Sequence, residues 1–257
     1  LERLAPTQPD HPGFVHYIIH AYDVPPLAPK AVKAARAYAK IAPSAPHALH
    51  MPSHTFTRLG YWQDSIDTNI ASAAAARREG STAEELHAMD YQTYAYLQLA
   101  QDRAARRMVL ALPEIQARFD PSRVASAAPG SAGVFAQAAI PARYALERQA
   151  WSEAAALELR PSRFPQADAM TWFARGLGAA HTGDLAAARA AIDTLQQLEA
   201  QLAQAGETYW TEQVAIQRLG VLAWTAFKDG RTEEALTTMR SPPDRHYRTE
   251  TNAVPPA

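Results

Sequence analysis

The chain has 257 residues, 47% of them hydrophobic, which is enough to bury the core of one or two domains. A net charge of −1 without clustered Lys and Arg disfavours binding to nucleic acid or to a membrane surface. The absence of cysteine excludes disulfides and thiolate chemistry, so a bound metal would need His, Asp, Glu, Tyr or water as ligands. No run of about 18 apolar residues is present, and no transmembrane helix is therefore predicted.

The composition predicts an all-α protein. Ala, Leu, Glu, Gln and Arg, which favour helices, dominate the sequence, whereas alternating Val, Ile or Thr runs bounded by Asn-Gly turns do not occur. To within a few residues, helices are expected near 13–22, 29–41, 47–59, 62–78, 83–99, 102–117, 132–147, 151–158, 166–181, 185–204, 207–228 and 232–239.

One of these helices contains a proline that should distort it. Pro52 lies inside the segment 47–59, where it cannot donate a hydrogen bond to the carbonyl of Ala48. The sequence therefore predicts a kink there, which would re-aim His47 and His50 relative to His54.

Five turns between the predicted helices share one pattern, a turn or polar break followed by a small residue five positions later. The turns begin near Gly60, Ala100, Gln149, Gly183 and Gly230, and the small residues are Ser65, Ala105, Ala154, Ala188 and Ala235. The pattern is similar to the turn between the two helices of a tetratricopeptide repeat, where a small residue lets the helices approach closely. It predicts a TPR-like helical-hairpin solenoid with about six helix pairs.

The domain organisation expected from this pattern is a single solenoid over residues 1–240. Its candidate joint is the segment 119–133, FDPSRVASAAPGSAG, which is the longest break between periodic segments. Residues 241–257 lack periodicity and are predicted to form an extended tail.

Histidines are concentrated near the start of the chain, where six of the nine lie between His11 and Gly60. If these segments are helical, each of two triplets lies along one stripe of its helix. The triplets are His16, His20 and Asp23 at i, i+4 and i+7, and His47, His50 and His54 at i, i+3 and i+7. In a tetratricopeptide solenoid both helices would line the concave groove, which predicts that the two stripes are neighbours.

Further side chains are candidates for the same cluster. The next groove-lining helix would contribute His87 or Asp90, and His11 would either cap its helix or reach the cluster. Imidazoles suit zinc, copper or iron, and the sequence does not distinguish among these ions. The candidate metal ligands are therefore His11, His16, His20, Asp23, His47, His50, His54, His87 and Asp90.

Two functional hypotheses follow from the histidines. In the first, the groove binds a transition metal, which would polarise water or substrate if the protein is an enzyme. In the second, the protein is a scaffold whose groove binds a peptide or protein partner without metal. The pair His16 and His20 has the spacing of helical zinc motifs, but no Glu follows His16, so the general base of a metalloprotease is missing.

The segments HPGFVHYIIHAYD and HALHMPSHTFTRLG resemble the histidine-bearing segments of a group of bacterial tetratricopeptide-repeat proteins, with patterns such as HPG-x-x-H-x-x-I-H and H-x-x-H-M-P-S-H-I. The similarity covers residues 10–60 closely and continues loosely through HAMDYQTYAYLQ. The resemblance implies a periplasmic or exported protein with further repeats before this region. Without the resemblance, composition alone leaves a cytoplasmic location open. The resemblance supports a site at these residues without naming the chemistry.

Overall fold

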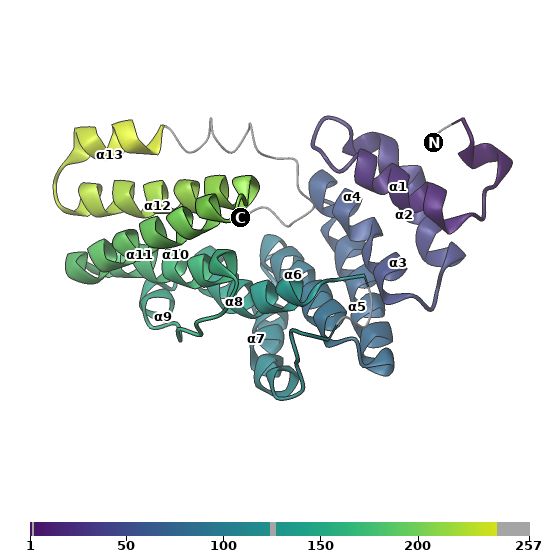
Figure 1. Ribbon diagram of the computed structural model, residues 1–257, viewed down its shortest axis with the longest axis horizontal. Coiled ribbons are helices and arrows are strands. Elements are labelled where there is room, and N and C mark those ends of the chain that lie inside the picture. The colour runs from purple at the N-terminus through teal and green to yellow at the C-terminus, as the bar shows by residue number, and fades with distance from the viewer. Residues whose placement is uncertain (2, 124–126, 241–257) are drawn as a thin grey trace. The chain divides into compact units, whose positions relative to one another are not determined.

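A computed structural model describes residues 1, 3–123 and 127–240 of the chain. These residues form helices without a β-strand, which confirms the predicted all-α class (Figure 1). The predicted tail, 241–257, lies outside the described residues, as does part of the predicted joint.

The helix bounds agree with the predicted ones to within about two residues, except that α9 is shorter and the segment 47–59 is divided. The helices are the 3-10 helix η1 (Ala5–Thr7), α1 (Pro12–Ala21), α2 (Ala28–Ile41), α3 (Pro46–His50), α4 (Pro52–Leu59), α5 (Trp62–Glu79), α6 (Thr82–Gln98), α7 (Asp102–Gln116), α8 (Gly130–Glu147), α9 (Trp151–Ala155), α10 (Pro165–Thr182), α11 (Leu185–Gln204), α12 (Thr208–Lys228) and α13 (Thr232–Met239).

The chain divides into two compact units, with the boundary inside α8 between Ala136 and Gln137. In the first unit α1 packs on α2, α2 on α4, α3 and α4 on α5, and α5 along α6, which also contacts α7. In the second unit α10 contacts α9, α11 and α12, and α12 also contacts α13. Each helix therefore packs mainly on helices that are close to it in sequence.

The helices of the first unit that carry histidines are joined by an apolar core. Val15 and Ile19 of α1 pack with Tyr38 of α2, Met51 and Phe56. Burial of Val15 and Ile19 orients α1 so that His16 and His20, one residue further on in each case, lie beside this core. The core therefore positions the histidines of α1 against those of α3 and α4.

The predicted interruption at Pro52 is present. The backbone N–H of Met51 still donates to the carbonyl of His47, whereas Pro52 has no N–H for the carbonyl of Ala48. The segment is consequently divided into α3, which carries His47 and His50, and α4, which carries His54.

The described residues contain seven turns that close with a residue of positive φ and a backbone bond across the turn. The residues are Gly60, Gly80, Ala100, Gln149, Gly183, Gly206 and Gly230. In each turn the next N–H donates to a carbonyl five residues earlier, as from Tyr61 to Phe56 at 2.8 Å, which is the bond of a Schellman motif. The five small residues predicted after turns are all buried, which confirms that these positions are tightly packed.

The exposed Ala100 has φ of 53°, in the left-handed region that glycine adopts at lower cost. We expect Ala100→Gly to raise the free energy of unfolding by about 0.5–1 kcal/mol, because relief of the Cβ clash outweighs the larger chain entropy of glycine. Urea unfolding measures the change. As a control, Ala190→Gly, at an exposed position inside α11, should lower stability by about 1 kcal/mol, and an equal loss in both variants would refute the explanation.

Candidate metal centre

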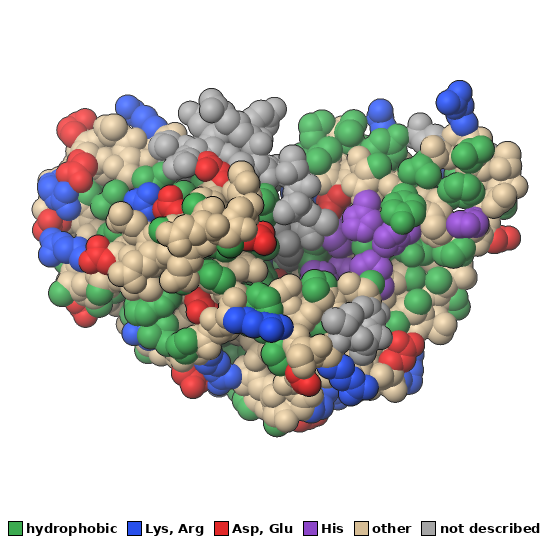
Figure 2. Space-filling model, in the orientation of Figure 1, with side chains coloured by type: hydrophobic (Ala, Val, Ile, Leu, Met, Phe, Trp, Pro, Cys, Tyr) green, Lys and Arg blue, Asp and Glu red, His purple; other side chains and the backbone are tan. Residues whose placement is uncertain are grey.

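Six histidines on four helices of the first unit form two triads. In each triad one ring nitrogen per histidine lies within 4.8 Å of the others. The buried triad consists of His50 from α3, His54 from α4 and His87 from α6, and the outer triad consists of His16 and His20 from α1 and His47 from α3. Histidine side chains gather in a patch on one face of the protein (Figure 2).

Two nitrogens of the buried triad are in direct contact. Nε2 of His50 lies 3.0 Å from Nε2 of His54, and the His50 ring centroid is 4.4 Å from that of His87. His50 is 0% exposed and His54 is 5% exposed, so solvent does not separate the two rings. What occupies the space between two imidazole nitrogens depends on which of them carry hydrogen.

The position of the hydrogen on His54 follows from Asp23. Nδ1 of His54 lies 2.8 Å from Oδ2 of Asp23, and Nε of Arg58 donates to Oδ1 of the same carboxylate at 3.0 Å. Burial opposes ionisation of Asp23, but the hydrogen bond and charge of His54, together with Arg58, outweigh it and lower the pKa of Asp23. An ionised carboxylate can only accept, and His54 therefore donates through Nδ1.

The position of the hydrogen on His50 follows from Asn69 of α5. Nδ1 of His50 lies 2.7 Å from Oδ1 of Asn69. The amide orientation is fixed because Nδ2 of Asn69 donates to the carbonyl of Ser65 at 2.7 Å. His50 must therefore donate through Nδ1, which leaves its Nε2 with a lone pair when the ring is neutral.

With both rings neutral, the two Nε2 atoms would face one another as acceptors at 3.0 Å, an arrangement that a proton or a metal ion between them would relieve. Burial and the neighbouring His87 and His54 hold the pKa of His50 well below its ordinary value of 6.5. Burial, followed by the charge of His54, likewise lowers the pKa of His87 to about 4. His50 and His87 therefore stay neutral near pH 7, as metal ligation requires.

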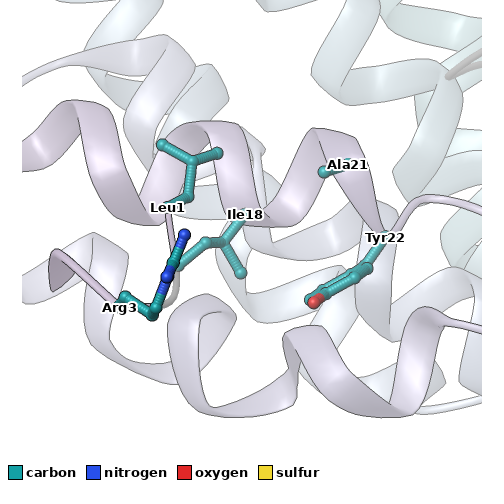
Figure 3. Close-up of a pocket in the computed structure, with 5 residues that line it drawn as sticks. All are labelled: Leu1, Arg3, Ile18, Ala21 and Tyr22. Atoms are coloured by element: carbon teal, nitrogen blue, oxygen red, sulfur yellow. The ribbon is translucent and has the colours of Figure 1, made fainter.

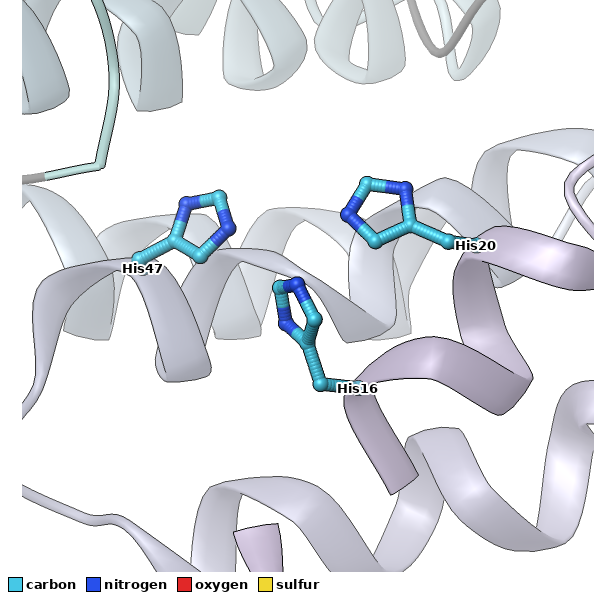
Figure 4. Close-up of side chains that lie close together, drawn as sticks. All are labelled: His16, His20 and His47. Atoms are coloured by element: carbon cyan, nitrogen blue, oxygen red, sulfur yellow. The ribbon is translucent and has the colours of Figure 1, made fainter. Parts of the chain in front are cut away.

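The outer triad is more accessible, with His20 exposed and the other two histidines half-buried. The three rings converge from α1 and α3 (Figure 4), with centroid distances of 4.6 Å from His16 to His20 and 5.2 Å from His16 to His47. Nδ1 of His16 lies 3.2 Å from the hydroxyl of Tyr38. Burial and the neighbouring His20 and His47 lower the pKa of His16 to about 4.

The three remaining candidate ligands belong to neither triad. Asp23 lies behind His54, where it orients the ring. His11 caps α1, because its Nδ1 accepts a hydrogen bond from the N–H of Gly13 at 3.1 Å. Asp90 is buried in α6.

Asn69 and Glu84 support the histidines but were not among the predicted residues. Asn69 holds Nδ1 of His50, and Glu84 lies beside His47. In the sequence each is one of several polar residues in its helix, and nothing there distinguishes it from a solvated side chain. A surface pocket beside α1, lined by Leu1, Arg3, Ile18, Ala21 and Tyr22, contains no histidine (Figure 3).

The fold and the site together define an all-helical protein with two adjoining histidine triads. Comparison with protein-family models and with curated proteins found no match. Among the described residues, no helix combines the length and the apolar character needed to cross a membrane. Inference of function therefore depends on the geometry of the triads.

Proposed function

We propose that the protein binds a transition metal ion through Nε2 of His50, Nε2 of His54 and a ring nitrogen of His87. The observation that carries the proposal is the 3.0 Å approach of two Nε2 atoms whose Nδ1 atoms already donate to Asp23 and Asn69. A carboxylate or amide oxygen behind each ligating histidine is typical of metal sites, where it fixes the tautomer and the ring orientation.

A proton shared between the two Nε2 atoms is the competing explanation for their approach. It would satisfy His50 and His54 but would leave His87 without a role in the cluster. A metal ion takes all three nitrogens, which already lie within 4.8 Å of one another. The convergence of a third imidazole, the half-buried His87, therefore favours a metal ion over a proton.

The ligand set narrows the choice of ion and of chemistry. Three neutral imidazoles without a thiolate suit Zn²⁺, Cu²⁺ or Fe²⁺. Three protein ligands leave a coordination position open, as in catalytic zinc sites, where the ion would lower the pKa of a water molecule or polarise a substrate. In this protein Asp23 and Asn69 would hold two of the ligands in place, and burial would exclude bulk water.

We further propose that the helical hairpins are of the tetratricopeptide type. The seven turns with a left-handed residue, and the buried small residue after five of them, support this assignment. The helices would then serve as a scaffold that brings α1, α3, α4 and α6 together around the triads.

The proposal is tested by titrating the full chain, purified without a polyhistidine tag, with Zn²⁺ against a chelator of known affinity. We expect at least one equivalent of Zn²⁺ to bind with micromolar affinity or better, with unchanged affinity in His11→Asn, since asparagine retains the helix cap. Asn69→Leu, which removes the acceptor for Nδ1 of His50, should weaken binding about 10–100-fold. Protein that binds no ion more tightly than millimolar would refute the proposal and favour a metal-free scaffold for a peptide or protein.

A further inference from the structure

Glu84 of α6 is a buried carboxylate that the proposed site does not use. It is 0% exposed, and its Oε1 accepts a hydrogen bond from the N–H of Ala128 at 2.8 Å. Its Oε2 has no hydrogen-bond partner. Among the described residues, no lysine or arginine lies within ion-pair distance of this carboxylate. A charge buried in this way is costly unless a cation compensates it.

The nearest titratable partner of Glu84 belongs to the outer triad. Oε1 of Glu84 lies 3.6 Å from Nδ1 of His47, and that nitrogen is also buried without a hydrogen-bond partner. At this distance the two atoms are close enough for an ion pair but too far apart for a hydrogen bond. Nδ1 of His47 and Oε2 of Glu84, at the inner end of the outer triad, therefore both lack a hydrogen-bond partner.

The outer triad otherwise has the same organisation as the buried one. Its three ring nitrogens lie within 4.8 Å of one another. The hydroxyl oxygen of Tyr38 contacts Nδ1 of His16, just as the carboxylate of Asp23 contacts Nδ1 of His54 in the buried triad. The two triads adjoin, with ring centroids 6.0 Å apart for His20 and His54 and 6.3 Å apart for His47 and His50.

We propose that the outer triad of His16, His20 and His47 binds a second divalent transition metal ion, with Glu84 supplying the compensating negative charge. The inference rests on the proposed function, since it extends a one-ion site to a pair of adjoining ions. The ion would provide the positive charge that the buried carboxylate lacks. The exposure of His20 gives this second position access to solvent and therefore to substrate.

A pair of adjoining ions indicates a class of reaction. Two-metal sites bind both the attacking and the leaving oxygen atoms in hydrolysis of phosphate esters. In this arrangement the buried triad would hold one ion firmly, and the outer triad would present the second ion to a substrate oxygen atom.

The test counts ions in variants that remove one triad at a time. After equilibrium dialysis against buffered Zn²⁺, we expect two equivalents in the wild type, one in the exposed-site variant His20→Asn, and one in His54→Asn. Within the His54→Asn background, where only the outer ion would bind, Glu84→Gln should weaken binding about 10–100-fold. Gln at this position keeps the acceptor for Ala128, and circular dichroism would verify that each variant is folded.

The outcomes separate the two proposals. One equivalent in the wild type that persists in His20→Asn would refute the second ion and leave the proposed function intact. One equivalent lost in both His20→Asn and His54→Asn would indicate a single ion shared by the triads, which also contradicts the inference. No bound ion in the wild type would refute the proposed function itself.

Discussion

Replacing His54 with asparagine is expected to abolish tight metal binding at the buried triad while the first unit stays folded. The asparagine amide can donate to Asp23 as Nδ1 of His54 does, so the carboxylate and Arg58 keep their hydrogen-bonding partner. Nothing in the new side chain replaces the lone pair on Nε2. Because a ligand is lost rather than a supporting residue, affinity should fall by more than the roughly 10–100-fold seen for outer-shell partners.

Isothermal titration calorimetry with Zn²⁺ in the His20→Asn background isolates the buried triad, and it measures this loss directly. His11→Asn in the same background is the matched control, because it changes the same residue type at a helix cap outside both triads. An affinity for Zn²⁺ that is equal in the two variants would mean that His54 is not a ligand.

The metal-free protein is expected to lose stability steeply as the pH falls from 6.5 to about 4. In this interval an unfolded chain protonates its histidines near 6.5, whereas the pKa of His87 in the folded chain is lowered to about 4 by burial. The unfolded state then binds more protons, and the free energy of unfolding decreases as the pH decreases. For His87 alone the lowering corresponds to a loss on the order of 3 kcal/mol at pH 4.

Urea unfolding at several pH values in a chelating buffer measures this dependence, and His87→Gln should reduce its slope between pH 6.5 and 4. A bound metal should oppose the loss near neutral pH, because it binds the neutral imidazoles of the folded state. A free energy of unfolding that does not change with pH in this interval would show that the histidines are not held neutral by the fold.

The positions of the helices were largely predictable from the sequence because their ends carry local signals. Gly60, Gly183 and Gly230 mark turns that need a left-handed residue. Ala100 and Gln149 adopt the same conformation without being glycine, and their turns were recognisable only from the small residue that follows. In these two cases packing of the next helix overrides the backbone preference of the residue.

The grouping of the histidines was only partly predictable. His47, His50 and His54 lie on one stripe, but an α-helix rises about 1.5 Å per residue, so the two ends of this stripe are too far apart for one ion. Together with the interruption at Pro52, this distance leaves His47 with the helix α1 and His50 and His54 with α6. Such a division depends on tertiary packing.

The residues that support the histidines were even less predictable from the sequence. Asn69 is functional in the proposed site only because Ser65 fixes its amide and α3 brings His50 against it. The contact between His50 and Asn69 joins residues that are 19 apart in the sequence, and no local pattern in the sequence of α5 indicates it.

X-ray absorption at the zinc edge tests the central claim most directly, using the full chain with His20→Asn and one equivalent of Zn²⁺. We expect a first shell that contains three imidazole nitrogens at about 2.0–2.1 Å, with the multiple-scattering features of histidine rings. A first shell of oxygen atoms with at most one imidazole would contradict ligation by His50, His54 and His87.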